Sequence, residues 1–166
     1  MRVVLFVLLV ASACKINLDK STTQPDGSAS GMMCQMGSAD TCQNVQPMLS
    51  SLQTNIFDGQ CTFSGCHNGG NTDAGKIDLR DGMAYAHLVG ATSYLEPSRK
   101  LVVASDTAAS YLEVMVGKIA PSDASPPAGP IQADIGLMPM DNAGALLCCQ
   151  KLDAIDMWIA AGAMNN

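Results

Sequence analysis

Apolar residues recur at helical spacing along much of the chain, and no convincing alternation of apolar and polar residues predicts a strand. The clearest pattern places apolar residues at offsets 0, 3, 4, 7 and 11 from residue 45, which is one face of a helix. Its members are Val45, Met48, Leu49, Leu52 and Ile56. This pattern predicts a helix that leads directly into Cys61.

Three further helices are expected. Asp81 and Asp106 are each placed to cap a short helix. The first of these carries Met83, Leu88 and Val89, and the second carries Ala108, Leu112, Met115 and Ile119. The last helix has Cys148, Leu152, Ile155 and Ile159 at offsets 0, 4, 7 and 11, with Trp158 beside them and Gly162 as its stop.

Long loops separate these helices. One contains Gly65, Gly69, Gly70 and Gly75, and a second, residues 121–130, is rich in Pro, Ser and Ala and leads to residues 136–140. The prediction is a small all-α domain with long loops. Helices alone should not hold such loops in place, so we expect a cofactor or disulfides to help.

The N-terminus has a different pattern. Arg2, an unbroken apolar run over residues 3–10 and three small residues have the order of a signal peptide. The run is far shorter than the roughly 20 residues of a membrane-spanning helix. Cys14 follows directly, and the junction resembles the lipobox of bacterial lipoproteins, although Ala11 stands where that family usually has Leu. Ordinary cleavage near Ala13 is the alternative.

The tract from residue 17 to residue 38 is polar, with too little apolar content to fold, and is expected to be a flexible tether. The predicted organisation is a signal peptide at residues 1–13, a lipid anchor and linker at 14–43, and one domain at 44–166. The protein is therefore expected to be exported and held by lipid on the periplasmic side or at the outer membrane. Lys15, not Asp, follows Cys14, and by the resemblance to bacterial lipoproteins this leans weakly toward the outer membrane.

Charge and motifs exclude several classes of function. The formal net charge is −6 and no basic residues cluster, so nucleic acid is not an expected partner. No nucleophile elbow and no phosphate-binding glycine loop is present in the sequence. We therefore expect neither Ser/His/Asp catalysis nor phosphate binding by a glycine loop.

Seven cysteines in an exported chain need an explanation, because thiols there do not stay free by default. With Cys14 assigned to lipid, six remain. They can form three disulfides, or two disulfides if Cys61 and Cys66 bind a cofactor. Both cases leave an even number of cysteines to pair, so the count does not decide between these interpretations. Cys148 and Cys149 rarely bond each other because the geometry is strained, so a bond from one of them to Cys42 is plausible.

Residues 61–67, Cys-Thr-Phe-Ser-Gly-Cys-His, suggest a cofactor. A c-type haem is held by thioethers from two cysteines, and the histidine after the second cysteine ligates the iron. Four residues separate Cys61 from Cys66 where two are usual, and Gly65 would let the extra residues bulge outward. Cys61, Cys66 and the proximal ligand His67 are thus the candidate haem site.

A distal ligand is expected from the loop before the last helix. A thioether there would complete a His/Met-ligated iron, and Met138 lies in that loop with Pro139 stiffening the backbone beside it. Met140 is the reserve ligand.

The chain resembles the short haem-c domains of exported proteins from large-genome environmental bacteria, within the cytochrome c-like superfamily. The resemblance covers roughly residues 45–163. It is carried by the helix entering Cys61, Cys66-His67-Asn68-Gly69, Asp78-Leu79, Ala84-Tyr85, Leu88-Val89, Ser110-Tyr111-Leu112, Gly136, Met138-Pro139, Trp158-Ile159 and Gly162-Ala163. The departures are the four-residue spacing and the pair Cys148-Cys149.

The resemblance implies a cytochrome c-like fold with one covalent haem c at Cys61 and Cys66, and iron ligated by His67 and Met138. The expected function is electron transfer to an unidentified redox protein. The alternative is a haem-free lipoprotein stapled by disulfides, with Cys61 bonded to Cys66 and a binding or envelope role. Zinc would lack a second ligand pair, an iron–sulfur cluster would want four thiolates, and His87 is expected to be a packing residue.

Overall fold

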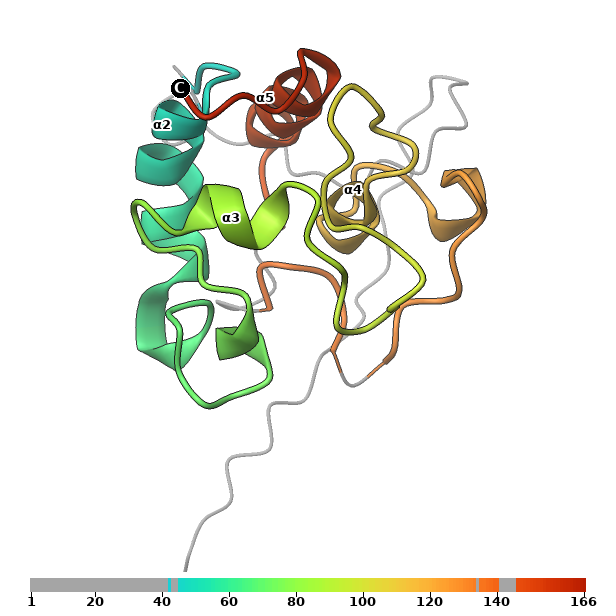
Figure 1. Cartoon of the computed structure of the whole chain (residues 1–166), viewed down its shortest axis with the longest axis horizontal. Coiled ribbons are helices and arrows are strands. Elements are labelled where there is room, and N and C mark those ends of the chain that lie inside the picture. Colours follow the sequence, from blue (N-terminus) through green and yellow to red (C-terminus); the bar gives the residue numbers. More distant parts are fainter. Residues whose placement is uncertain (1–41, 43–44, 134, 141–145) are drawn as a thin grey trace, which may run out of the picture.

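The computed structural model describes residue 42 and residues 45–133, 135–140 and 146–166. These residues form a small, mostly helical domain in which no strand occurs, as predicted from the sequence (Figure 1). Its elements in order are α2 (Leu49–Leu52), the π-helix η1 (Gln53–Cys61), the 3₁₀ turns η2 (Phe63–Gly65) and η3 (Ala74–Lys76), α3 (Ala84–Leu88), α4 (Tyr111–Met115), the 3₁₀ turn η4 (Pro121–Asp123) and α5 (Cys149–Ala160).

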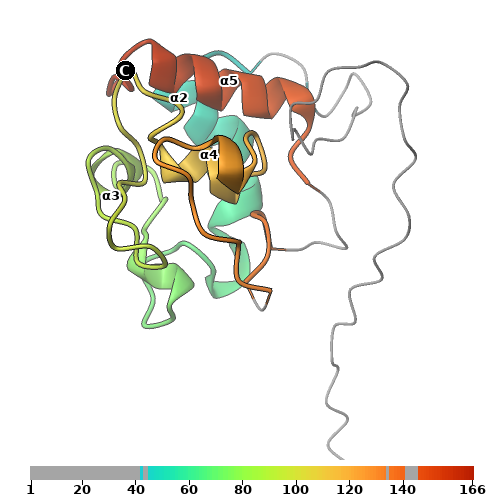
Figure 2. The same cartoon turned by 90° about the vertical axis from the view of Figure 1, so that its right-hand side faces the viewer.

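The last predicted helix is confirmed as α5. Leu152, Ile155, Trp158 and Ile159 are all buried, and the helix ends before Gly162, whose φ of +103° an L side chain would resist. In both views α5 lies beside α2, so the first and last helices pack together (Figures 1 and 2). The pattern from Cys148 therefore identified the core face of this helix.

The first predicted helix is present in two parts. Leu49, Leu52 and Ile56 are buried as expected, whereas Met48 lies before α2 and is 41% exposed. From Gln53 onward the chain winds as a π-helix, a rare form that often occurs at functional sites. Its wider turn also buries Phe57, and it ends at Cys61.

The two predicted aspartate caps are wrong. Helix α3 begins after Met83 and α4 after Ser110, and neither has a capping bond from a side chain. The Ser110 hydroxyl donates to Asp106 O at 2.7 Å and accepts from Val103 N–H at 2.9 Å. These bonds hold the chain before α4 in a turn, so Ala108 falls outside the helix that was expected to contain it. Ile119 also falls outside, because α4 ends at Met115.

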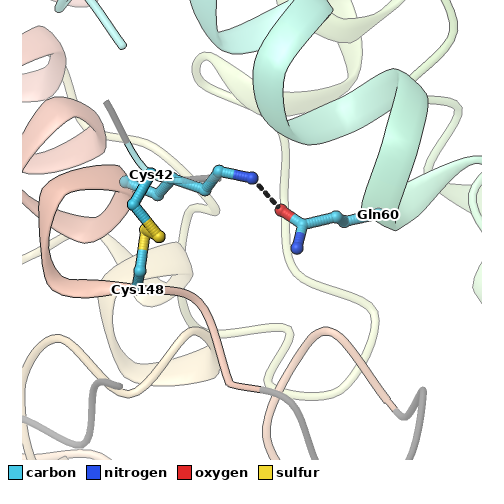
Figure 3. Close-up of a disulfide and its surroundings, with 4 residues drawn as sticks. Cys42, Gln60 and Cys148 are labelled. Carbon is cyan, nitrogen blue, oxygen red and sulfur yellow. Dashed lines mark hydrogen bonds between the residues drawn. A yellow bond between two sulfur atoms is a disulfide. The ribbon is translucent and has the colours of Figure 1, made fainter. Parts of the chain in front are cut away.

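A disulfide ties the first described residue to the residue just before α5. Cys42 and Cys148 form a disulfide with their Cα atoms 6.2 Å apart, which confirms the expected pairing of Cys42 with one of the neighbouring cysteines (Figure 3). Cys149 is also disulfide-bonded. Cys42, placed by the sequence in the linker, is thus fixed at the start of α5.

The described residues contain no helix long and apolar enough to cross a membrane. The predicted signal peptide, Cys14 and the tract 17–38 lie outside the described residues.

Candidate haem site

An apolar cavity of about 260 Å³ lies among η1, α4, α5 and the loop over residues 135–140. Its volume is close to the lower end of the roughly 300–1,000 Å³ of small-molecule sites. Leucine, isoleucine, valine, phenylalanine and methionine side chains make up most of its wall. Cys61, Cys66, His67 and Met138, the four residues singled out from the sequence, all line it.

The four residues between the two cysteines fold into a compact turn. Cys61 ends η1, the turn η2 follows, and Cys66 N–H donates to Phe63 O at 3.0 Å. Gly65 has a φ of +82°, and a Cβ there would meet no atom within 4 Å. His67 N–H then donates to Cys61 O at 2.9 Å, which closes the loop. The wider spacing therefore still returns His67 to the backbone of Cys61.

Both cysteines are free thiols. The expected alternative of a Cys61–Cys66 disulfide is therefore not what the structure contains. Burial raises the pKa of the Cys61 thiol to about 12, and the positive charge of Lys151 opposes this shift. The wall of the apolar cavity thus carries two thiols that are in no disulfide, and burial keeps that of Cys61 protonated.

The His67 ring is held by the loop that follows it. Its Nδ1 lies 3.3 Å from Ile77 O, and because a carbonyl only accepts, Nδ1 carries the proton in this bond. Burial lowers the pKa of His67, which favours the neutral ring. Nε2 then keeps its lone pair, and a second-nitrogen bond of this kind is the usual support of a metal-ligating histidine.

Three methionines line the cavity. Met138 is half-buried and its N–H donates to Met115 O at 2.8 Å, so α4 fixes the loop that carries it. Met140, the reserve ligand, is 59% exposed. Met115 is 6% exposed and was predicted only as a residue on a helix face. No motif in the sequence marked it as part of the cavity.

The other metal sites considered from the sequence gain no support. His87 is not among the lining residues, and its Nδ1 accepts the N–H of Asp78 at 3.2 Å. Within the residues that the structure describes, no three His, Cys, Asp or Glu side chains are grouped to hold a metal ion. Cys61, Cys66 and His67 are thus not arranged as three ligands of one zinc.

A buried cation lies behind the cavity wall. Lys151 on α5 is 8% exposed, and its Nζ donates to Gln60 Oε1 at 2.7 Å, the dashed bond in Figure 3. Gln60 itself lines the cavity next to Cys61. Sequence patterns missed Lys151 because a lysine in an amphipathic helix is ordinarily assigned to its solvent face.

The chain leaving His67 is fixed by a buried carboxylate. Leu79 N–H donates to His67 O at 2.9 Å. The carboxylate of the preceding residue, Asp78, accepts from Arg80 Nη2 at 2.6 Å and from Arg80 Nε at 2.9 Å. These bonds hold the pKa of Asp78 down to about 2. Gly69 lies against the same group, since a Cβ there would be 2.7 Å from Asp78 Oδ2.

Comparison of the chain with protein-family models, curated proteins and solved structures gave no match.

Proposed function

We propose that this protein is a single-haem c-type cytochrome that carries electrons. The observation that carries the proposal is the meeting of two free cysteines, a neutral histidine and a methionine on one apolar cavity. The cytochrome c-like fold belongs to the same proposal, which the helical domain with long loops supports in its coarser form.

The residues present fit a haem in three respects. The thiols of Cys61 and Cys66 are available for thioether bonds to two vinyl groups, because neither is in a disulfide. Because Ile77 O holds Nδ1 of His67, Nε2 would be the nitrogen that binds iron. The walls are apolar, as a porphyrin ring requires, and Met138 on the same wall would be the second residue to hold the iron.

A haem held here would supply an iron that takes up and releases one electron. The roles of the chain follow from its contacts. Ile77 O orients His67, Met115 O anchors the backbone of Met138, and the apolar wall excludes water. If His67 and Met138 both held the iron, they would occupy it against a substrate, which favours an electron carrier over an enzyme.

The partner in this proposal is a redox protein, met through the small and transient contact typical of electron transfer. The signal-peptide pattern and Cys14 support a lipid-anchored place on the periplasmic side or at the outer membrane.

Absorbance tests the proposal. The full chain is expressed with and without a cytochrome c maturation system, and the purified protein is examined for haem bands and for covalent haem on a denaturing gel. We expect both signals only with maturation, and their loss in Cys61→Ser/Cys66→Ser. A matured protein without either signal would contradict the proposal and favour the haem-free lipoprotein.

A further inference from the structure

We propose that Lys151 raises the reduction potential of the haem by holding a positive charge behind the cavity wall. This inference rests on the proposed function. It assigns to the charge of Lys151 an effect on the reduction potential that no sequence motif indicates.

The lysine is buried and its charge is not neutralised. Its Nζ donates to the neutral amide of Gln60, whereas Lys76, Arg80, Arg99 and Lys118 each pair with a carboxylate. Among the described residues no salt bridge includes Lys151. A buried cation is costly unless something compensates it, so a lysine kept 8% exposed beside an amide suggests a use for its charge.

The charge acts on the cavity itself. Gln60 and Cys61 both line the cavity, and Lys151 lowers the pKa of the Cys61 thiol that burial otherwise raises. The influence is mutual, since Cys61 opposes the lowering of the Lys151 pKa by burial. Helix α5, anchored by the Cys42–Cys148 bond at its start, keeps the ammonium at this position.

A fixed cation favours the state of a nearby centre that has less positive charge. Ferrous iron is one charge less positive than ferric iron, so Lys151 shifts the equilibrium toward the reduced form. For a poorly screened charge in a protein, we expect the shift to be about tenfold, which is about 59 mV for one electron.

The test is a spectroelectrochemical titration of the haem-loaded full chain. Lys151→Met should lower the midpoint potential by about 59 mV. Lys151→Arg keeps the positive charge and should have the midpoint potential of the wild type. Lys118→Met is the matched control: it removes the same unit of charge, but from an ammonium 2.7 Å from the half-exposed Asp153 carboxylate. It should change the potential much less, and all variants should keep the absorbance spectrum of the wild type.

A second variant decides the matter if Lys151→Met does not fold. Gln60→Glu keeps the lysine but places a carboxylate against its Nζ, and should lower the potential in the same direction. Equal potentials in the wild type and the charge variants, with haem bound in all, would overturn the role of Lys151 and leave the proposed function standing. A wild-type protein that binds no haem after maturation would overturn both.

Discussion

Burial separates the three methionines that line the cavity. Met115 is almost fully buried within α4, Met138 is half-buried in a loop that Met115 O holds, and Met140 is exposed. A loop residue with partial burial can turn its thioether into the cavity without disturbing a helix. Met138 therefore remains the best candidate for the distal ligand.

Substitution distinguishes these methionines. Met138→Ala should leave covalent haem in place and open the sixth position, so that carbon monoxide or imidazole binds and changes the absorbance spectrum. Met140→Ala is the control and should bind neither. The assignment is wrong if Met140→Ala or Met115→Ala opens the iron and Met138→Ala does not.

Gly69 is a second residue whose identity the structure explains. Its φ is +74°, and a Cβ would lie 2.6 Å from Arg80 Nη2 and 2.7 Å from Asp78 Oδ2. Gly82 has a similar φ of +77° but no atom within 4 Å of such a Cβ. We therefore expect Gly82→Ala to lower the free energy of unfolding by about 1–2 kcal/mol, the cost of the backbone conformation alone.

Gly69→Ala should cost clearly more than Gly82→Ala, because the buried Asp78–Arg80 pair must also shift. Urea unfolding of both variants measures the difference. Equal losses of stability would show that the pair yields freely and that only the positive φ matters.

At the scale of elements, sequence periodicity identified core faces better than helix ends. The pattern from Cys148 and the three residues Leu49, Leu52 and Ile56 were correct because burial against a neighbour sets the period. Asp81 and Asp106 failed as caps because other backbone bonds set the helix starts. Ala84 N–H donates to Arg80 O at the start of α3, and Tyr111 N–H donates to Lys100 O at the start of α4. The π-helical winding of η1 could not be predicted either, because the spacing of its apolar residues fits an α-helix equally well.

The candidate site was partly predictable for a related reason. Cys61, Cys66 and His67 stand close together in the chain and carry a recognisable motif, and Met138 was chosen by its order relative to the last helix. Met115 and Lys151 reach the cavity region only through the packing of α4 and α5, which no local pattern encodes. Site residues that lie close together in the sequence could be predicted, whereas those that reach the cavity only through helix packing could not.

The interface of α4 and α5 contains a buried acid. Glu113 is fully buried and neither carboxylate oxygen has a hydrogen-bond partner among the described residues. Burial raises its pKa to about 8, with Asp156 and Asp153 adding to the shift and Lys118 opposing it. The folded protein therefore keeps a proton that the unfolded chain releases near pH 4.5.

This difference predicts how stability depends on pH. Between about pH 4.5 and pH 8 the folded state binds the extra proton, so stability falls as pH rises through this window, by on the order of a few kcal/mol. Glu113→Gln should flatten the dependence and raise the melting temperature at pH 8 while changing it little at pH 5. Asp156→Asn should weaken the dependence partially. An unchanged slope in Glu113→Gln would show that another group causes it.

At the scale of the whole molecule, a covalent bond joins residues 106 positions apart in the chain. Cys42 meets Cys148 at the start of α5, the helix that carries Lys151. This helix packs on α2 (Figure 2). The bond therefore fixes the point at which the N-terminal segment enters the domain to the start of α5.

Anchoring itself is tested at Cys14. Acylation adds membrane affinity of about 0.8 kcal/mol per buried methylene, so several acyl chains hold a protein firmly, and a tether then confines the carrier to the vicinity of membrane-bound partners. Cys14→Ser should release the protein into the soluble periplasmic fraction, with the melting temperature of the domain unchanged because its core and its Cys42–Cys148 bond are untouched. Ser28→Ala, a change in the polar tract that follows Cys14, is the control and should leave the protein in the membrane fraction. If Cys14→Ser stays with the membrane, something other than lipid at Cys14 holds the protein there, and cleavage near Ala13 without acylation becomes the better account of the N-terminus.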